Sequence, residues 1–429
     1  MKWTVEGGGW VAASMVAAVL AGWPSGAESA EKPQADKPVT YSNQVVRILQ
    51  KHCQACHRPG EVAPFSLLSY EKAKQWSETI REVVTEGRMP PWLADPKHGK
   101  FANDRSLTQQ EIDTLLAWID GGMPKGDDRE LPEPLKFVEG WQIGEPDVVL
   151  TMSQEFTVPA RGTVEYQYFT LPTNFTEDKW VQAVEVRAGN RKVVHHILML
   201  IVPPGSRGED GRLRPRNSDD EALGFFAAMA PGTMPSAFPA GFGKKIPKGA
   251  EIVFQVHYTP IGTEETDRSS VGIVFAKEPV HTEIRTRGVF NNSFVIPPGA
   301  PNYPVRAAYR FPQDSYVLDL LPHTHLRGKT FEYVAVFPDG KSKKLLSIPR
   351  YDFNWQLTYR LAEPLLMPKG SKLVCTAHYD NSAANKANPD AKKRVTWGDQ
   401  TWDEMMIGYF NYHVANPSVA ARPGTSPGE

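Results

Sequence analysis

From about residue 137 onward, the chain consists of short apolar segments in close succession, and this pattern constrains the fold more than any other feature. Segments such as TVEYQYFTL, KWVQAVEVR, AEIVFQVHYTP and SKLVCTAHYD are rich in β-branched and aromatic residues, and Pro or Gly turns separate them. Proline contributes 37 of the 429 residues, which is above its usual share of about 5%. The pattern predicts about sixteen strands, enough for two antiparallel, jelly-roll-like β-sandwiches.

Two pairs of histidine-bearing segments divide this all-β region into halves. The segment VVHHILML precedes FQVHYTP by 61 residues, measured from His196 to His257, and LPHTHLRGK precedes CTAHYDNS by 53 residues, measured from His325 to His378. This weak internal repeat predicts one β-sandwich in each half. The expected ranges are 137–280 for the first sandwich, 285–415 for the second, and 416–429 for a flexible tail.

A different kind of motif precedes the strand-rich region. Cys53, Cys56 and His57 form Cys-x-x-Cys-His, a spacing in which two thiols can bond to haem vinyl groups while the imidazole ligates the iron. A zinc site would need a second cysteine pair, whereas Cys375 is the only other cysteine. A redox dithiol would be expected in a βαβ setting, and the flanking sequence has none.

Helical patterns surround this motif at 43–52, 71–87 and 107–122, and the third opens with a capping box from Thr108 to Glu111. Three helices around such a motif resemble the class I cytochrome c fold, which implies a small helical cytochrome c domain at 41–127 with covalently bound haem c. In cytochromes of this kind, a downstream Met usually completes the coordination of the iron. Met89 fits because two prolines fix the loop that follows it; Met123 and His98 are the alternatives.

The N-terminus has the pattern of an export signal. Lys2 precedes an apolar stretch, and small residues offer a cleavage site after Ala27. We expect a signal peptide at 1–27 and a linker at 28–40; the alternative, an uncleaved anchor, has too few apolar residues to span a bilayer. Because c-type haem is attached outside the cytoplasm, both features predict a bacterial exported protein in the periplasm, with a periplasmic electron donor.

Charge and cysteine content exclude several other classes of protein. The net charge is −1 and no long basic run occurs, so neither nucleic acid nor an anionic membrane surface is an expected partner. No segment after the N-terminus is apolar enough to cross a membrane. With two of its three cysteines assigned to haem, the chain has no pair left for an internal disulfide.

Two histidine motifs in the strand-rich region have metal-binding potential. His323 and His325 would share one face of a strand, and Met405 or Met406 could add a thioether. Two imidazoles and a thioether favour copper, particularly Cu(I), although two exposed histidines and a core Met explain these residues equally well. The adjacent His195 and His196 would point to opposite faces of a regular strand.

The order of the motifs HH, QVHY, HTH and DEM resembles the copper type II, ascorbate-dependent monooxygenases, over about 137–415. The resemblance implies two copper ions, O2 as co-substrate and hydroxylation of a C–H bond in a small organic or peptide-like substrate. It also implies that both adjacent histidines reach one ion, which requires a twist or bulge in their strand. The implied ligands are His195, His196 and His257 for the electron-transfer copper and His323, His325 and Met405 for the copper that binds oxygen.

Departures from that family limit the substrate. Leu321 and Pro322 occupy the stretch where the peptidylglycine enzymes have a carboxylate-binding Arg, so a peptidylglycine substrate is not expected. Tyr409 resembles another carboxylate contact, and His378 is a secondary candidate for the oxygen-binding site. The haem domain is expected to replace ascorbate as the electron source. The alternative function is a non-catalytic haem and copper protein for electron transfer or copper binding.

Overall fold

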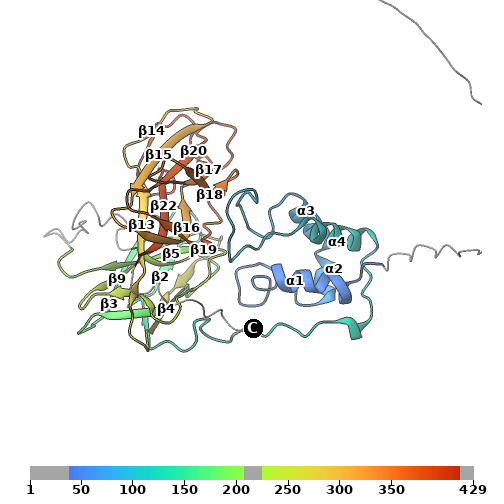
Figure 1. Cartoon of the computed structure of the whole chain (residues 1–429). Helices are drawn as coiled ribbons and strands as arrows, with labels where there is room; N and C mark the ends of the chain where they lie inside the picture. Colours follow the sequence, from blue (N-terminus) through green and yellow to red (C-terminus); the bar gives the residue numbers. More distant parts are fainter. Residues whose placement is uncertain (1–37, 207–224, 416–429) are drawn as a thin grey trace, which may run out of the picture. The chain divides into compact units, whose positions relative to one another are not determined.

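The computed structural model describes residues 38–206 and 225–415 (Figure 1). The expected signal peptide, most of the expected linker and the expected tail lie outside these residues. The described chain from Val39 onward forms one unit by its internal contacts. Most of its regular structure is strand, as the sequence predicted. Within the described ranges, no helix has the length and apolar character needed to cross a membrane.

The region around the Cys-x-x-Cys-His motif is helical and has its own apolar core, which includes Leu49, Leu115 and Trp118. The capping box at Thr108 and Glu111 is confirmed at the start of α4. The helix predicted at 71–87 divides at Trp76, whose backbone leaves helical geometry where its ring stacks on Phe65 at 4.0 Å. The elements are the π-helical turn η1 (Tyr41–Val45), α1 (Val46–His52), α2 (Tyr70–Gln75), α3 (Ser77–Thr85) and α4 (Gln109–Asp120).

The first half of the strand-rich region contains two main sheets, ordered β1-β11-β4-β8-β12, with β7 beside β4, and β3-β9-β5-β6; β2 and β10 form a separate pair. Side chains from both main sheets share one core, for example Val184, Ile197 and Phe254. The strands are β1 (Val148–Thr151), β2 (Phe156–Val158), β3 (Gln167–Pro172), β4 (Lys179–Arg187), β5 (Val194–Val202), β6 (Phe225–Met229), β7 (Ser236–Ala237), β8 (Phe242–Ile246), β9 (Glu251–Tyr258), β10 (Glu265–Asp267), β11 (Ser270–Phe275) and β12 (Thr282–Glu283).

The second half also has two main sheets, ordered β13-β22-β16-β19 and β15-β20-β17-β18, with β14 and β21 as a separate pair. Their shared core includes Leu320, Phe331 and Phe410. The strands are β13 (Arg285–Phe290), β14 (Val295–Ile296), β15 (Tyr303–Arg310), β16 (Ser315–His323), β17 (Gly328–Val336), β18 (Ser342–Ile348), β19 (Tyr359–Met367), β20 (Lys372–Tyr379), β21 (Val395–Thr396) and β22 (Ile407–Val414).

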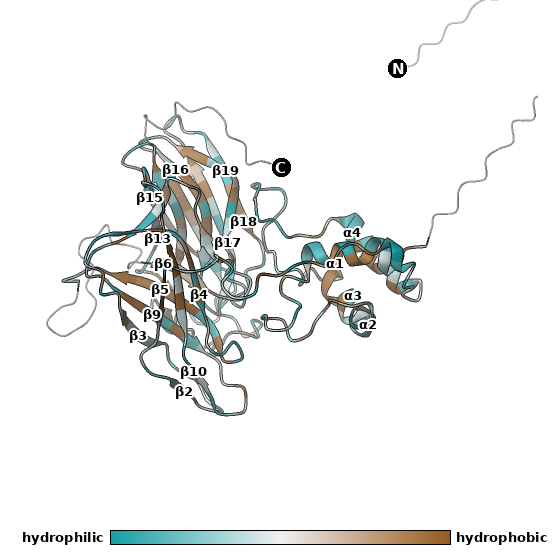
Figure 2. Cartoon of the chain, turned by 90° about the horizontal axis from the view of Figure 1, so that it is seen from below, coloured by the Kyte–Doolittle hydropathy of each residue, from teal (hydrophilic) through white to brown (hydrophobic). Residues whose placement is uncertain are grey.

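The strand pairing changes partners between the two halves. β12 pairs with β8 of the first half, whereas β13 pairs with β22 of the second. In Figure 2, apolar residues run along the strands of both halves, where the two cores lie.

The loop between α3 and α4 is tied to the second half. Phe101 forms an isolated bridge with Leu361, and the amide of Ala102 donates to the carbonyl of Arg360 at 2.8 Å. Trp92 packs on Tyr359 with ring centroids 4.8 Å apart. This attachment means that the loop is part of the packing of the second half. Whether the helical region itself is a cytochrome c domain stays a prediction.

Candidate functional site

Three histidines converge where β5 and β9 pair. His196 lies directly opposite His257 in the antiparallel register, and the register shifts between Val194 and His196. His195 therefore occupies a bulge, the departure from a regular strand that a shared ion would require. One ring nitrogen from each of the three histidines lies within 4.8 Å of the others. We call these residues the first cluster.

Burial keeps the imidazoles of the first cluster neutral. It lowers the pKa of His257 to about 3 and, together with the neighbouring imidazoles, lowers that of His196 well below its usual value. Burial also lowers the pKa of His195, with partial opposition from Asp352. Since a metal binds the neutral imidazole, this set is already in the ligand form at neutral pH.

His323 and His325 also lie together, and we call this pair the second cluster. His323 ends β16 and His325 follows in the next loop, with ring centroids 5.2 Å apart and nearly perpendicular planes. Both side chains are buried. Burial lowers the pKa of His323 to about 4 and that of His325 well below its usual value. Both imidazoles are therefore neutral as well.

The two imidazoles differ in how their ring nitrogens are used. Nδ1 of His323 lies 2.7 Å from Oε1 of Gln356; the amide oxygen can only accept, so Nδ1 carries the proton and Nε2 keeps its lone pair. Both ring nitrogens of His325 are buried, and neither has a hydrogen-bond partner in the described ranges. Backbone groups of Asp403 and Gln400 oppose this lowering of the His325 pKa without meeting hydrogen-bond geometry. Such a buried, unsatisfied ring costs about 1–3 kcal/mol, a cost that a metal ion would remove.

A buried carboxylate fixes the loop that carries His325. Glu404 accepts hydrogen bonds from the amides of His325 at 2.9 Å and Arg327 at 2.6 Å. Burial raises the pKa of Glu404 to about 8, although these amide bonds oppose the shift. Arg327 is itself fully buried and donates to Oδ1 of Asn381 at 2.9 Å. Glu404 is the acidic residue next to Met405 in the DEM motif, and this supporting role was not predicted from the sequence.

The strand register separates the two candidate methionines. His323 pairs with Ile407 across β16 and β22, and alternate residues of an extended chain share a face. Met405 therefore falls on the His323 side, whereas the adjacent Met406 is fully buried in the core. The backbone carbonyl of Met405 accepts a hydrogen bond from Tyr379 at 2.7 Å. Of the two alternatives, Met405 is the one in register with the second cluster.

The two secondary candidates occupy different surroundings. The ring of Tyr409 lies 6.4 Å from that of His323 and stacks on Phe225 of the first half at 4.8 Å. His378 lies on β20, where its Nδ1 is 2.9 Å from the hydroxyl of Thr330. That hydrogen bond occupies one ring nitrogen of His378.

One aromatic ring lies between the two clusters. Phe353 stacks on His195 at 5.6 Å and lies 6.2 Å from His257, while the ring of His325 is 6.1 Å away on the other cluster. Tyr166 packs against His196 and His257, at 5.5 and 5.2 Å. Neither aromatic residue was predicted, because Phe353 follows no periodic pattern and Tyr166 precedes a strand like many other aromatic residues.

The predicted haem-binding residues lie in the helical region. Nδ1 of His57 lies 3.2 Å from the carbonyl oxygen of Phe65, so that nitrogen donates and Nε2 keeps its lone pair. Cys53 and Cys56 are free thiols, and burial raises the pKa of Cys53 to about 12, which is unsuited to a reactive dithiol. Met89 is half-buried in the loop after α3, whereas Met123 packs against the helical core.

A cavity of about 340 Å³ lies between the Cys-x-x-Cys-His motif and the first cluster. Cys56, Arg105 and His195 all contribute to its walls. Beside it, Arg191 of the first half forms an ion pair with Glu61 at 3.1 Å. The haem candidate and the first cluster thus face a common space.

A known protein family matches part of this chain. Residues 286–424 match the family model "Copper type II ascorbate-dependent monooxygenase, C-terminal domain". This segment includes His323, His325 and Met405, and its match supports a copper-dependent oxidoreductase of the monooxygenase class. A search of curated proteins finds no match.

Solved structures resemble the chain only weakly. The major capsid protein P2 of bacteriophage PM2 has 10% sequence identity and a TM-score of 0.29, over 63% of this chain and 98% of that one. Allantoicase from Saccharomyces cerevisiae has 8% identity and a TM-score of 0.18, over 59% and 79%. The VP2 subviral particle of infectious bursal disease virus has 8% identity and a TM-score of 0.17, over 64% and 83%. These similarities are too low to support any argument.

Proposed function

We propose that this chain is a copper-dependent monooxygenase that hydroxylates a C–H bond of an organic substrate with O2. One observation carries the proposal: the segment that matches the monooxygenase family contains two buried, neutral histidines with free ring nitrogens, and Met405 in register with them. Imidazole and thioether donors together suit copper better than zinc or magnesium. The donor set of the second cluster therefore fits the metal of the matched family.

Residues around the second cluster prepare it for a metal ion. Gln356 holds the His323 ring with Nε2 available, and Glu404 holds the backbone at His325. Orienting groups of this kind strengthen metal ligands and set their direction. Copper held by His323, His325 and Met405 would supply the chemistry that reduces O2 and oxygenates the substrate. The burial of both imidazoles keeps bulk water away from that chemistry.

The first cluster is proposed to hold a second copper through His195, His196 and His257. Three imidazoles without a thioether suit a copper that changes oxidation state readily. Insertion of one oxygen atom from O2 consumes two electrons and two protons, and the other oxygen atom leaves as water. The proximity of the two clusters across Phe353 supports electron supply from the first cluster to the second.

Haem c attached at Cys53 and Cys56, with His57 as an iron ligand, is proposed as the source of these electrons. The free Nε2 of His57 fits iron ligation, since the other ring nitrogen donates to a carbonyl. The cavity shared by Cys56 and His195 supports a direct route to the first cluster. Met89 remains our candidate for the sixth iron ligand. Export to the periplasm and a periplasmic electron donor belong to the same proposal.

The decisive experiment is to count metals in protein exported by a host that matures c-type haem. We expect one iron and two coppers per chain, and O2 uptake matched by a hydroxylated product. Copper that is bound and changes oxidation state without O2 uptake would favour a non-catalytic electron-transfer protein. Iron without any copper, even after reconstitution, would contradict the proposed function.

The haem proposal needs a variant that leaves the fold intact. Deletion of the helical region would remove Trp92 and Phe101, which pack against the second half. Replacing Cys53 and Cys56 by Ser removes the attachment points only. Turnover with a protein reductant should then be lost, while turnover with ascorbate should persist; equal loss with both reductants would contradict this role.

A further inference from the structure

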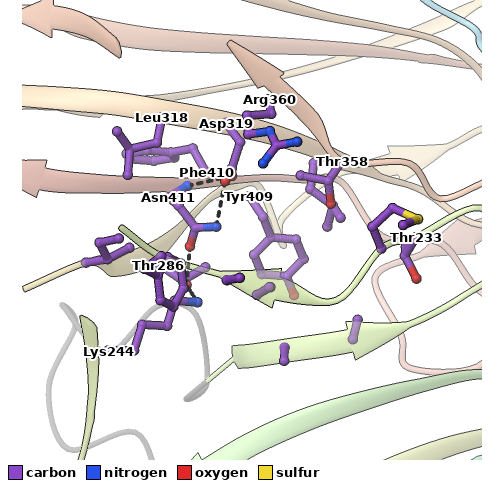
Figure 3. Close-up of a pocket in the computed structure, with 18 of the residues that line it drawn as sticks. Thr233, Lys244, Thr286, Leu318, Asp319, Thr358, Arg360, Tyr409, Phe410 and Asn411 are labelled. Atoms are coloured by element: carbon purple, nitrogen blue, oxygen red, sulfur yellow. Dashed lines mark hydrogen bonds between the residues drawn. The ribbon is translucent and has the colours of Figure 1, made fainter. Parts of the chain in front are cut away.

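A cavity of about 510 Å³ lies between the two halves (Figure 3). The ring of Tyr409 in its wall lies 6.4 Å from that of His323 in the second cluster. Its walls come from β6 to β8 of the first half and from β16 and β22 of the second. Phe225 and Tyr409, which stack on each other across the halves, form part of its apolar lining. The cavity is large enough for a small organic molecule.

A chain of hydrogen bonds forms its polar floor. The ammonium of Lys244, 4% exposed, donates to the carbonyl of Phe226 and to the hydroxyl of Thr286, both at 2.7 Å. Thr286 donates to Oδ1 of Asn411 at 2.6 Å, and Nδ2 of Asn411 donates to Asp319 at 2.9 Å. An ammonium group has three hydrogens, so Lys244 keeps one donor beyond the two bonds found among the described residues.

Two arginines add positive charge to the cavity wall. Arg105 comes from the loop before α4, and Arg360 lies at the start of β19 (Figure 3 shows Arg360 beside Asp319). In the described part of the chain, neither guanidinium forms an ion pair or a hydrogen bond. Among the described residues that line the cavity, Asp319 is the one carboxylate, against Lys244, Arg105 and Arg360. The cavity therefore favours an anion over a cation.

The strand register relates this floor to the second cluster. Across β16 and β22, Asp319 pairs with Asn411, Leu321 with Tyr409, and His323 with Ile407. These alternate positions share one face. Four residues of strand separate Asp319 from His323, a span of about 13 Å at 3.3 Å per residue. The polar floor and the metal ligands thus lie at opposite ends of one apolar strip.

We propose that this cavity binds an elongated organic anion, a carboxylate with an apolar body. Its carboxylate meets Arg360 and the free donor of Lys244, and its body lies over Leu321 and Tyr409 with the far end toward His323. This identifies the substrate class of the monooxygenase and rests on that proposed function for the chemistry at His323. Binding itself needs only the residues of the cavity.

The test measures binding to the full-length, copper-free protein by titration calorimetry. The probe is 6-phenylhexanoate, and the matched neutral probe is 6-phenylhexan-1-ol. The test variant is Arg360→Gln, because this arginine is exposed and its loss should leave the fold intact. The control is Arg310→Gln, an exposed arginine at the end of β15 that does not line the cavity.

We expect the carboxylate to bind at least tenfold more tightly than the alcohol. Arg360→Gln should weaken carboxylate binding about tenfold, a loss typical of one charged hydrogen bond, and should leave alcohol binding unchanged. Arg310→Gln should change neither. Equal binding of the two probes, no binding of either, or equal effects of the two variants would overturn the proposal. Because copper is absent, a failure of copper loading or O2 uptake would instead contradict the proposed function alone.

Discussion

The two histidine clusters are held in different ways. In the first cluster, a backbone bulge at His195 brings adjacent histidines together. Among the described residues, the only hydrogen-bond contact of these three rings is between His195 and His196, whose Nδ1 atoms are 3.2 Å apart. In the second cluster the strand register is continuous from Asp319 to His323. Two buried polar side chains, Gln356 and Glu404, support this cluster: Gln356 bonds to the His323 ring and Glu404 to the backbone amide of His325.

This difference indicates that the protein and the bound ion contribute differently to the geometry of the two clusters. Three neutral rings that rest mainly on apolar and aromatic neighbours can adjust their directions around an ion at little cost. Rings and backbone held by Gln356 and Glu404 keep their positions before any metal arrives. We therefore expect the second cluster to be preorganised and the first to be shaped partly by its ion.

The largest expected effect comes from removing one histidine of each cluster. His196→Ala should empty the first cluster and His325→Ala the second, each with a loss of copper affinity above 100-fold, since removal of a supporting residue alone costs 10–100-fold. His378→Ala, which removes a histidine bonded to Thr330, is the control. Copper counts per chain check this. Loss of both coppers in either variant would show that the two clusters bind copper only together, and would contradict their separate support.

Removal of the Glu404 carboxylate should be the next largest effect. Glu404→Ala leaves the buried amides of His325 and Arg327 without an acceptor. Each buried donor left without a partner costs about 1–3 kcal/mol, so the variant should lose about 2–6 kcal/mol. Urea unfolding measures the loss, and Glu363→Ala, at an exposed position of β19, is the control. Similar unfolding free energies for the two variants would mean that the Glu404 hydrogen bonds do not stabilise the loop that carries His325.

The orienting bond to His323 allows a finer test. Gln356→Leu removes the acceptor of the Nδ1 hydrogen and should weaken copper at the second cluster by roughly 10–100-fold. Gln356→Glu keeps an acceptor at this position and should preserve affinity. Copper titration of each variant, monitored by spectroscopy, measures the copper affinity of each cluster separately. An equal loss of copper affinity at the first cluster would contradict the independent support of the two clusters.

The histidine pairs were accessible to sequence reasoning because strand periodicity is local. The i, i+2 spacing of His323 and His325 and the adjacency of His195 and His196 each imply a definite geometry. The bulge at His195 followed from the need for both rings to reach one ion. The choice between Met405 and Met406, by contrast, depended on which of them enters the core, and this depends on the register with β16.

The supporting residues could not be predicted in the same way. Gln356 and Phe353 lie in an irregular segment before β19, where no periodicity indicates a direction. Glu404 acts on amides almost eighty residues earlier in the chain, and one sequence contains no signal for such a long-range bond. The break between α2 and α3 at Trp76 likewise depends on a distant ring, Phe65. Local pattern, together with the family resemblance, therefore predicted the candidate ligands but not the residues that support them.

The smallest expected effect concerns Phe353, the residue that the two clusters share. Phe353→Leu should cost roughly 1–2 kcal/mol of stability, because it removes buried apolar volume and leaves a small cavity. Phe331→Leu, in the core of the same half, should cost a similar amount and serves as the control. Only the Phe353 variant touches His195, His257 and His325, so only it should alter the copper spectra.

The change in the copper spectrum caused by Phe353→Leu should also differ between the two clusters. The first cluster has two rings against Phe353 and, among the described residues, no polar side chain outside the cluster that bonds to them, so its copper spectrum should change more. The second cluster keeps Gln356 and Glu404 in the variant, and its spectrum should change less. An equal change at both clusters would mean that Phe353, rather than the bulge or the polar supports, sets the geometry of the whole site.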